Sequence, residues 1–161
     1  SSASAPSRPT PADRVALALA TVGGAGYAPI APGTAGSAVT VLALWLVPFS
    51  RPGLVAFLAA VTVAGLWAAH RAERVLGGKD PGAIVIDEVA GMTVAMLWAP
   101  LSLPALLAGF VLFRVFDIVK PWPAGAAQRL HGGLGVMVDD LIAGLYAAAV
   151  LAVARRLAGW P

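Results

Sequence analysis

The chain has 161 residues, of which 59% are hydrophobic and 12% charged, with a net charge of +3 and a mean hydropathy of +0.83. Soluble domains carry roughly 25% charged residues, so this composition excludes an ordinary soluble domain and indicates a helical membrane protein. The basic residues are scattered between apolar segments, which argues against a nucleic-acid partner, and the absence of cysteine excludes disulfides and thiolate metal ligands.

The N-terminal part of the chain is polar and rich in glycine. Residues 1–12 form a proline-containing lead that we expect to be disordered, followed by one membrane-embedded domain over residues 13–161. Residues 14–22 are apolar but too few to cross a membrane. The next segment, GGAGYAPIAPGTAGS at 23–37, contains five glycines and two prolines, which predicts a loop ahead of a helix.

Thr34 and Ser37 stand at the end of this loop, directly before a long apolar run. A glycine-rich turn that leads into a helix presents free backbone N–H groups and the positive end of the helix dipole, which suits a phosphate. Both residues are therefore candidate phosphate ligands. The alternative is that one of them is an ordinary helix N-cap.

Five apolar runs predict an all-α, polytopic membrane bundle. A helical span needs about 20 residues, so the first and third runs are marginal and four spans are the alternative to five. The runs are 38–49, 54–69, 84–99, 105–119 and 136–153.

The charges indicate how such a bundle is oriented, because successive connections lie on alternate sides of the membrane. Arg51, Arg155 and Arg156 fall on one side, and the other eight basic residues fall on the side of the N-terminus. The positive-inside rule then places the N-terminal side in the cytoplasm. All eight acids fall on that side, so we expect the motif loops and the site to face the cytoplasm. The eight basic residues on the N-terminal side are Arg8, Arg14, Arg71, Arg74, Lys79, Arg114, Lys120 and Arg129.

Two segments, IVIDEVAGM and VMVDDLIAGL, each place a pair of acids ahead of a glycine. Asp87 and Gly91 are four residues apart, as are Asp140 and Gly144, so each acid shares a helix face with a glycine. We expect the glycines to let another helix approach that face closely.

Six acids near the ends of apolar runs are candidate metal ligands. Carboxylates at the edge of a bilayer are costly unless they are paired, hydrated or bound to a cation. A set of oxygen ligands without a cluster of histidine or cysteine favours Mg²⁺. The alternative is that these acids cap helices or pair with Lys79, Arg114 and Lys120. The six are Asp80, Asp87, Glu88, Asp117, Asp139 and Asp140.

Arg114, Asp117 and Lys120 are spaced by three residues, which brings an arginine, a carboxylate and an ammonium group to one rim. Because Pro121 disfavours the helical conformation at Lys120, we expect the helix to end there. The two cations are candidate phosphate ligands, and a local ladder of ion pairs is the alternative. His70 and His131 lack a neighbouring nitrogen or sulfur ligand, which is typical of ordinary interfacial residues.

Four motifs, APGTAGS, KDPGAIVIDEVAG, FRVFDIVKPWP and GGLGVMVDDLIAG, occur in this order over about residues 23–145. Together they resemble the phosphatidylglycerophosphatase A family of small bacterial membrane lipid phosphatases. The resemblance implies Mg²⁺-dependent removal of the terminal phosphate from phosphatidylglycerophosphate, in phospholipid biosynthesis at the bacterial cytoplasmic (inner) membrane. It implies a site made of Lys79, Asp80, Asp87, Glu88, Arg114, Asp117, Lys120, Asp139 and Asp140.

The sequence leaves the chemical step open. A water molecule activated by one or two Mg²⁺ ions is one route, with Asp140 or Asp87 taking its proton and with Asp139 and Glu88 in the same catalytic set. An aspartyl-phosphate intermediate is the other route. The alternative function is a small ion-coupled carrier that uses the clustered carboxylates. The sequence makes no prediction of the oligomeric state.

Overall fold

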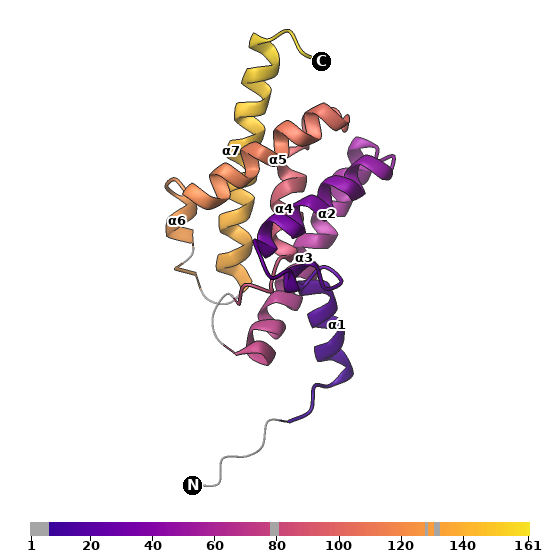
Figure 1. Ribbon diagram of the computed structural model, residues 1–161, viewed down its shortest axis with the longest axis vertical. Helices are drawn as coiled ribbons and strands as arrows, with labels where there is room; N and C mark the ends of the chain where they lie inside the picture. Colours follow the sequence, from indigo (N-terminus) through magenta and orange to yellow (C-terminus); the bar gives the residue numbers. More distant parts are fainter. Residues whose placement is uncertain (1–6, 78–80, 128, 131–132) are drawn as a thin grey trace.

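The computed structural model describes residues 7–77, 81–127, 129–130 and 133–161. Within these ranges every regular element is a helix, as the all-α prediction requires. Figure 1 shows a long C-terminal helix that extends beyond the other helices at one end of the molecule. The elements are α1 (Pro11–Ala20), the 3₁₀ helix η1 (Ala25–Tyr27), α2 (Pro32–Leu46), α3 (Arg51–Leu76), α4 (Ile86–Ala95), α5 (Leu103–Val119), α6 (Ala124–Ala127) and α7 (Gly133–Leu157).

Helix α1 forms within the short apolar segment and packs along α3. Thr10 caps it in a reciprocal capping box with Asp13, so the helix begins inside the stretch that we expected to be disordered; residues 1–6 lie outside the described residues. Asp13 also accepts a hydrogen bond of 2.7 Å from Arg71 of α3. The Thr10 backbone N–H and the Arg71 guanidinium hold the pKa of Asp13 below its usual value. Small residues, Ala16 and Ala20, make the close contact with α3.

Helix α2 begins earlier than we predicted. The expected loop extends to Ser37, but the helix starts at Pro32, whose fixed φ suits the first helical position. A glycine-rich sequence forms helix here because α2 packs closely on its neighbours: a Cβ atom at Gly36 would lie 3.0 Å from the Val85 side chain. The N-cap is Ala31, so neither Thr34 nor Ser37 caps this helix.

Two helices, α3 with 26 residues and α7 with 25, are long and apolar enough to cross a membrane. Helices α2 and α5 have 15 and 17 residues, fewer than the 20 or so that a span needs. Helix α4, from the third predicted run, has 10 residues, all buried, and its length of about 15 Å is half of a hydrocarbon layer. The structure therefore does not confirm five spans.

Helix α4 occupies the centre of the bundle and makes its most extensive contact with α7. Glycines allow this contact, because a Cβ atom at Gly91 would lie 2.6 Å from the carbonyl oxygen of Asp140. A Cβ atom at Gly144 would in turn overlap the carbonyl oxygen of Gly91. The predicted close approach through these two glycines is confirmed.

The C-terminal end of α4 is capped by an arginine from another helix. Nη1 of Arg51, the first residue of α3, donates hydrogen bonds to the carbonyl oxygens of Met96 (3.0 Å) and Leu97 (2.8 Å). Its Nη2 donates to Ala99, and Arg155 of α7 donates to Trp98 at 3.2 Å. These arginines, which we interpreted only as topology determinants, donate to backbone carbonyl groups of the connection that follows α4.

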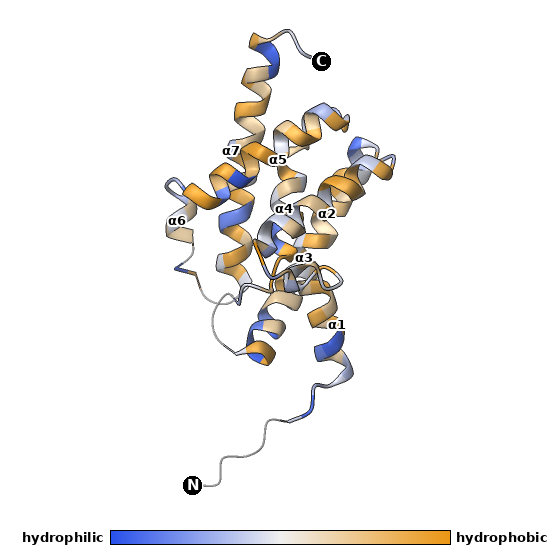
Figure 2. Cartoon of the chain, in the orientation of Figure 1, coloured by the Kyte–Doolittle hydropathy of each residue, from blue (hydrophilic) through white to orange (hydrophobic). Residues whose placement is uncertain are grey.

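Parts of four helices meet around one cavity, away from the C-terminal end of α4. The starts of α2 and α4, the end of α5 and the second turn of α7 come together around one cavity. Figure 2 shows that hydrophilic residues concentrate on the early turns of α7, at the lower ends of α1 and α3 and at the C-terminal end of α7. Most of the remaining helix surface is apolar. The fold thus brings the acidic motifs of the sequence together.

Candidate active site

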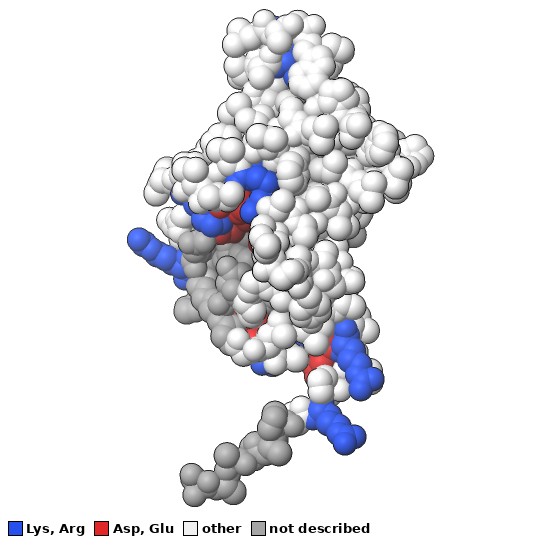
Figure 3. All heavy atoms as spheres, viewed as in Figure 1, with Lys and Arg blue, Asp and Glu red and all other residues white. Residues whose placement is uncertain are grey.

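A cavity of about 310 Å³ lies where these helix ends converge. Figure 3 shows it as a hollow in which acidic atoms lie beneath basic ones, on a molecule whose surface above is nearly free of charge. The cavity is lined by Pro32, Gly33, Gly82, Ile84, Val85, Asp87, Glu88, Arg114, Asp117, Ile118, Lys120, Val136, Asp139 and Asp140.

Three carboxyl groups form the floor of this cavity. One oxygen each of Asp87, Glu88 and Asp140 lies within 4.8 Å of the other two, although α4 and α7 are far apart in the sequence. All three residues are buried, with exposed fractions of 4%, 7% and 1%. The glycine-mediated contact between α4 and α7 is what brings the two acid pairs together.

The donor set fits a hard divalent cation. The cluster contains only carboxylate oxygens, which Mg²⁺ prefers. Oδ2 of Asp140 and Oδ1 of the neighbouring Asp139 are buried, and neither receives a hydrogen bond from the residues that the structure describes. Buried carboxylate oxygens without a donor are unfavourable, and a bound cation would compensate them. Asp87, Glu88 and Asp140 are the residues placed to hold it.

Two cations lie directly beside the carboxylates. Nη1 of Arg114 pairs with Asp117 and, at 3.2 Å, with Oε2 of Glu88. Nζ of Lys120 lies 3.0 Å from both Asp117 and Asp139, and 4.0 Å from Asp140. Asp117 therefore bridges the two cations and holds them in place. The sequence also predicted Asp117 as a metal ligand, and it is not among the three acids of the cluster. The ion pairs that we gave as the alternative are present and lie in the same cavity.

The charge of Lys120 is favoured by its surroundings. Partial burial acts to lower the pKa of its ammonium group, but the negative charges of Asp117 and Asp139 outweigh burial and hold that pKa above its usual value. Lys120 is therefore a cation at neutral pH, with a side chain that is 26% exposed toward the cavity mouth. Such a group suits a phosphate.

The first turn of α2 borders the cations. A Cβ atom at Gly33 would lie 2.8 Å from Oε1 of Glu88 and 3.0 Å from Nη1 of Arg114, so only glycine fits without displacing them. Ser37 donates to the carbonyl oxygen of Gly33 (2.9 Å) and, more weakly, to Oε2 of Glu88 (3.5 Å). Neither Ser37 nor Thr34 is among the residues that line the cavity, and their predicted role as phosphate ligands stays a prediction.

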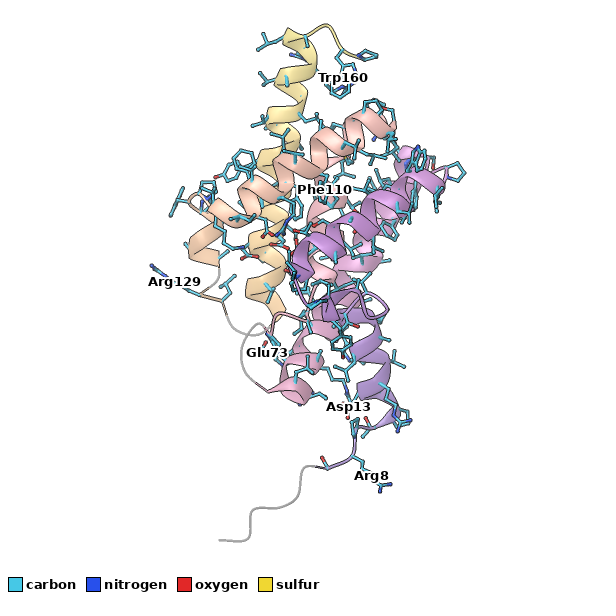
Figure 4. The ribbon with its side chains drawn as sticks, in the orientation of Figure 1. Arg8, Asp13, Glu73, Phe110, Arg129 and Trp160 are labelled. Carbon is cyan, nitrogen blue, oxygen red and sulfur yellow. The ribbon has the colours of Figure 1, made fainter. Side chains whose placement is uncertain are left out.

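Several candidates stand apart from this group. Lys79 and Asp80 lie outside the described residues, as does His131, and their predicted roles stay predictions. His70 is exposed on α3. In Figure 4 the side chains of Arg129 and Arg8 point away from the bundle.

The apolar rim of the cavity is a feature that the motifs did not reveal. Ile118 is 68% exposed and lines the mouth one helical turn beyond Arg114, and Val136 and Val85 line the walls. The position of Ile118 four residues after Arg114 was a usable signal, because residues with that spacing share a helix face. The site thus combines charged and apolar surfaces.

Fold and cavity together define a class: an apolar helical protein whose buried carboxylate cluster suits a hard cation and whose paired basic residues suit a phosphate. The family model described as phosphatidylglycerophosphatase A matches residues 18–155 of the sequence. The chain belongs to the phosphatidylglycerophosphatase A family.

Two of three individual relatives carry the name of this family. The chain is 36% identical to phosphatidylglycerophosphatase A of Escherichia coli, with 80% of this chain and 76% of the relative covered. It is 38% identical to the protein of the same name in Haemophilus influenzae, with 80% and 81% covered. It is also 39% identical to a putative phosphatidylinositol-3-phosphatase of Bacteroides thetaiotaomicron, with 84% and 91% covered. No solved structure matches the chain.

Proposed function

We propose that this chain is a Mg²⁺-dependent lipid phosphatase that hydrolyses phosphatidylglycerophosphate to phosphatidylglycerol and inorganic phosphate. One observation carries the proposal: the carboxylates of Asp87, Glu88 and Asp140 lie in the same cavity as Arg114 and Lys120. A phosphomonoester needs both a cation site and basic groups for its oxygens. Membership of the phosphatidylglycerophosphatase A family supports the choice of substrate.

Mg²⁺ bound by Asp87, Glu88 and Asp140 would supply charge neutralisation at the phosphoryl oxygens and a bound water of lowered pKa. The protein groups around that site have separate tasks. Arg114 and Lys120 hold the phosphoryl oxygens and offset the negative charge as the ester bond breaks. Gly33 lets Arg114 and Glu88 lie directly against the first turn of α2, and a side chain at this position would displace them.

The reaction forms a P–O bond to water and breaks the P–O bond to the glycerol oxygen. A carboxylate of the cluster takes one proton from the water, and the resulting carboxylic acid returns that proton to the departing glycerol oxygen. Asp140 and Asp87 are the two candidates for this base, each through the carboxylate oxygen that does not bind the cation. Direct attack by a carboxylate, with an aspartyl-phosphate intermediate, remains the alternative route.

The lipid nature of the substrate agrees with the surface around the mouth. Ile118 and Val119 are 68% and 69% exposed next to Lys120, so the phosphate meets charge while the rest of the lipid meets apolar side chains. We place the protein in the bacterial cytoplasmic membrane as a multi-pass protein. The basic residues on the N-terminal side support a site that faces the cytoplasm.

The test is phosphate release by the purified protein in detergent, with phosphatidylglycerophosphate and phosphatidylinositol 3-phosphate offered separately. We expect release from the first lipid at least about tenfold faster, a difference of about 1.4 kcal/mol in transition-state binding. Faster release from the inositol lipid would contradict the proposed substrate and would favour the activity in the name of the Bacteroides relative. If folded protein released phosphate from neither lipid, the phosphatase proposal would be wrong, and the ion-coupled carrier would become the leading hypothesis.

A further inference from the structure

The turn that carries Lys120 has an unusual backbone conformation. Lys120 follows the end of α5 with φ 49°, in the left-handed region that a residue with a side chain adopts at a steric cost. Bonds within the turn, such as Lys120 N–H to Phe116 O at 2.9 Å and Ala124 N–H to Pro121 O at 2.9 Å, close it locally. A conformation of this kind persists when the surrounding structure holds it in place.

A tyrosine from another helix supplies such a hold. The hydroxyl of Tyr146 in α7 donates a hydrogen bond of 2.6 Å to the carbonyl oxygen of Trp122. The ring of Tyr146 packs on Phe116, with the ring centroids 5.6 Å apart. This hydrogen bond joins the backbone of the turn at residues 120–123 to a side chain of another helix.

Helix α7 therefore fixes the turn at two points. Asp139 binds the Lys120 ammonium group at 3.0 Å, and Tyr146, seven residues further along the same helix, binds the backbone behind it. The ion pairs with Asp139 and Asp117 hold the ammonium group but not the backbone of the turn that carries it. The second attachment restricts the ammonium group to the cavity mouth, beside Asp117.

We propose that Tyr146 is a positioning residue that holds the Lys120 ammonium group where it meets the substrate phosphate. Its importance for the reaction rests on the proposed function, whereas its effect on the position of Lys120 does not. Tyr146 belongs neither to the carboxylate cluster nor to the residues that line the cavity, and it acts through the turn. The sequence motifs did not include it.

The kinetic test is a double-mutant cycle with Tyr146→Phe and Lys120→Ala. Removing only the hydroxyl keeps the ring against Phe116, and we expect kcat/KM for phosphatidylglycerophosphate to fall about fivefold, the size of one hydrogen bond. In the Lys120→Ala background the same change should have no further effect, since the lysine it positions is gone. Tyr27→Phe, at the other tyrosine of the chain, is the matched control and should match the wild type.

A measurement without turnover tests the positioning directly. The chain has two lysines, so acylation of Lys120 by an N-hydroxysuccinimide ester can be followed by mass spectrometry relative to Lys79. We expect Tyr146→Phe to raise the rate at Lys120 about fivefold, because the hydrogen bond that restricts its turn is lost. Tyr27→Phe should leave it unchanged.

Two results would overturn the proposal. One is that Tyr146→Phe lowers kcat/KM equally in the wild-type and Lys120→Ala backgrounds. The other is that Tyr146→Phe leaves the acylation rate at Lys120 unchanged. A wild-type protein that hydrolyses no phospholipid would refute the proposed function instead. The acylation rates would still decide whether Tyr146 holds Lys120.

Discussion

Gly144 of α7 packs directly on the carbonyl oxygen of Gly91 in α4, so closely that neither position has room for a side chain. Each glycine lies one helical turn beyond an acid of the site, Asp140 in α7 and Asp87 in α4. The contact therefore sets the distance between the two halves of the carboxylate cluster. Any residue that separates the helices also separates the oxygens that hold the cation.

Replacing Gly91 by alanine should destabilise the protein and inactivate it. The new Cβ atom would lie 2.6 Å from both the Asp140 carbonyl oxygen and the Phe113 ring, so the helices must move apart. Overpacking of this kind costs about 1–3 kcal/mol, and thermal unfolding in detergent measures it.

Gly82→Ala is the stability control, because a Cβ atom there meets nothing within 4 Å. Equal unfolding midpoints for Gly91→Ala and Gly82→Ala would mean that the close helix contact is not needed.

Arg51→Ala should lower the free energy of unfolding by about 1.5–3 kcal/mol, the size of a hydrogen bond from a charged donor. Three carbonyl oxygens at the end of α4 lose their donor together. Arg155→Ala removes one hydrogen bond from the same connection and should cost less. If the two variants have the same unfolding midpoint in detergent, Arg51 does not cap α4.

Gly33→Ala should reduce activity more than stability. Its Cβ atom would meet the ends of two side chains, Glu88 at 2.8 Å and Arg114 at 3.0 Å, which can move aside. Moving them disturbs the phosphate-binding groups, so we expect kcat/KM to fall about tenfold or more, as when one electrostatic contact to the reacting group is lost. An active variant with normal kinetics would show that the first turn of α2 does not border the bound phosphate.

The sequence predicted those features that depend on neighbouring residues. The end of α5 at Lys120 followed from Pro121, and the close contact of α4 with α7 followed from the spacing of acid and glycine. These patterns are local, because a proline restricts the preceding residue and four residues complete about one helical turn.

Features that depend on distant contacts were missed. The sequence APGTAGS favours a loop by composition, yet its glycines lie in α2 because Val85 and Glu88 pack against them. The third apolar run was a marginal span by length, and it contains a helix of 10 residues, all buried; hydropathy alone does not distinguish a lipid-facing helix from one that other helices surround. Tertiary packing decided both, as it commonly overrides local propensity.

A Mg²⁺ titration tests directly whether the carboxylate cluster holds the cation used in phosphate release. Phosphate release from phosphatidylglycerophosphate is measured over a Mg²⁺ titration and with chelator, for the wild type, Asp140→Asn and Asp13→Asn. Asp140→Asn keeps the shape of the side chain but removes its charge, whereas Asp13 pairs with Arg71 outside the cavity. We predict Mg²⁺-dependent release that falls at least about 100-fold in Asp140→Asn and is unchanged in Asp13→Asn. Release that persists in chelator, or an Asp140→Asn protein with wild-type Mg²⁺ dependence, would contradict the account.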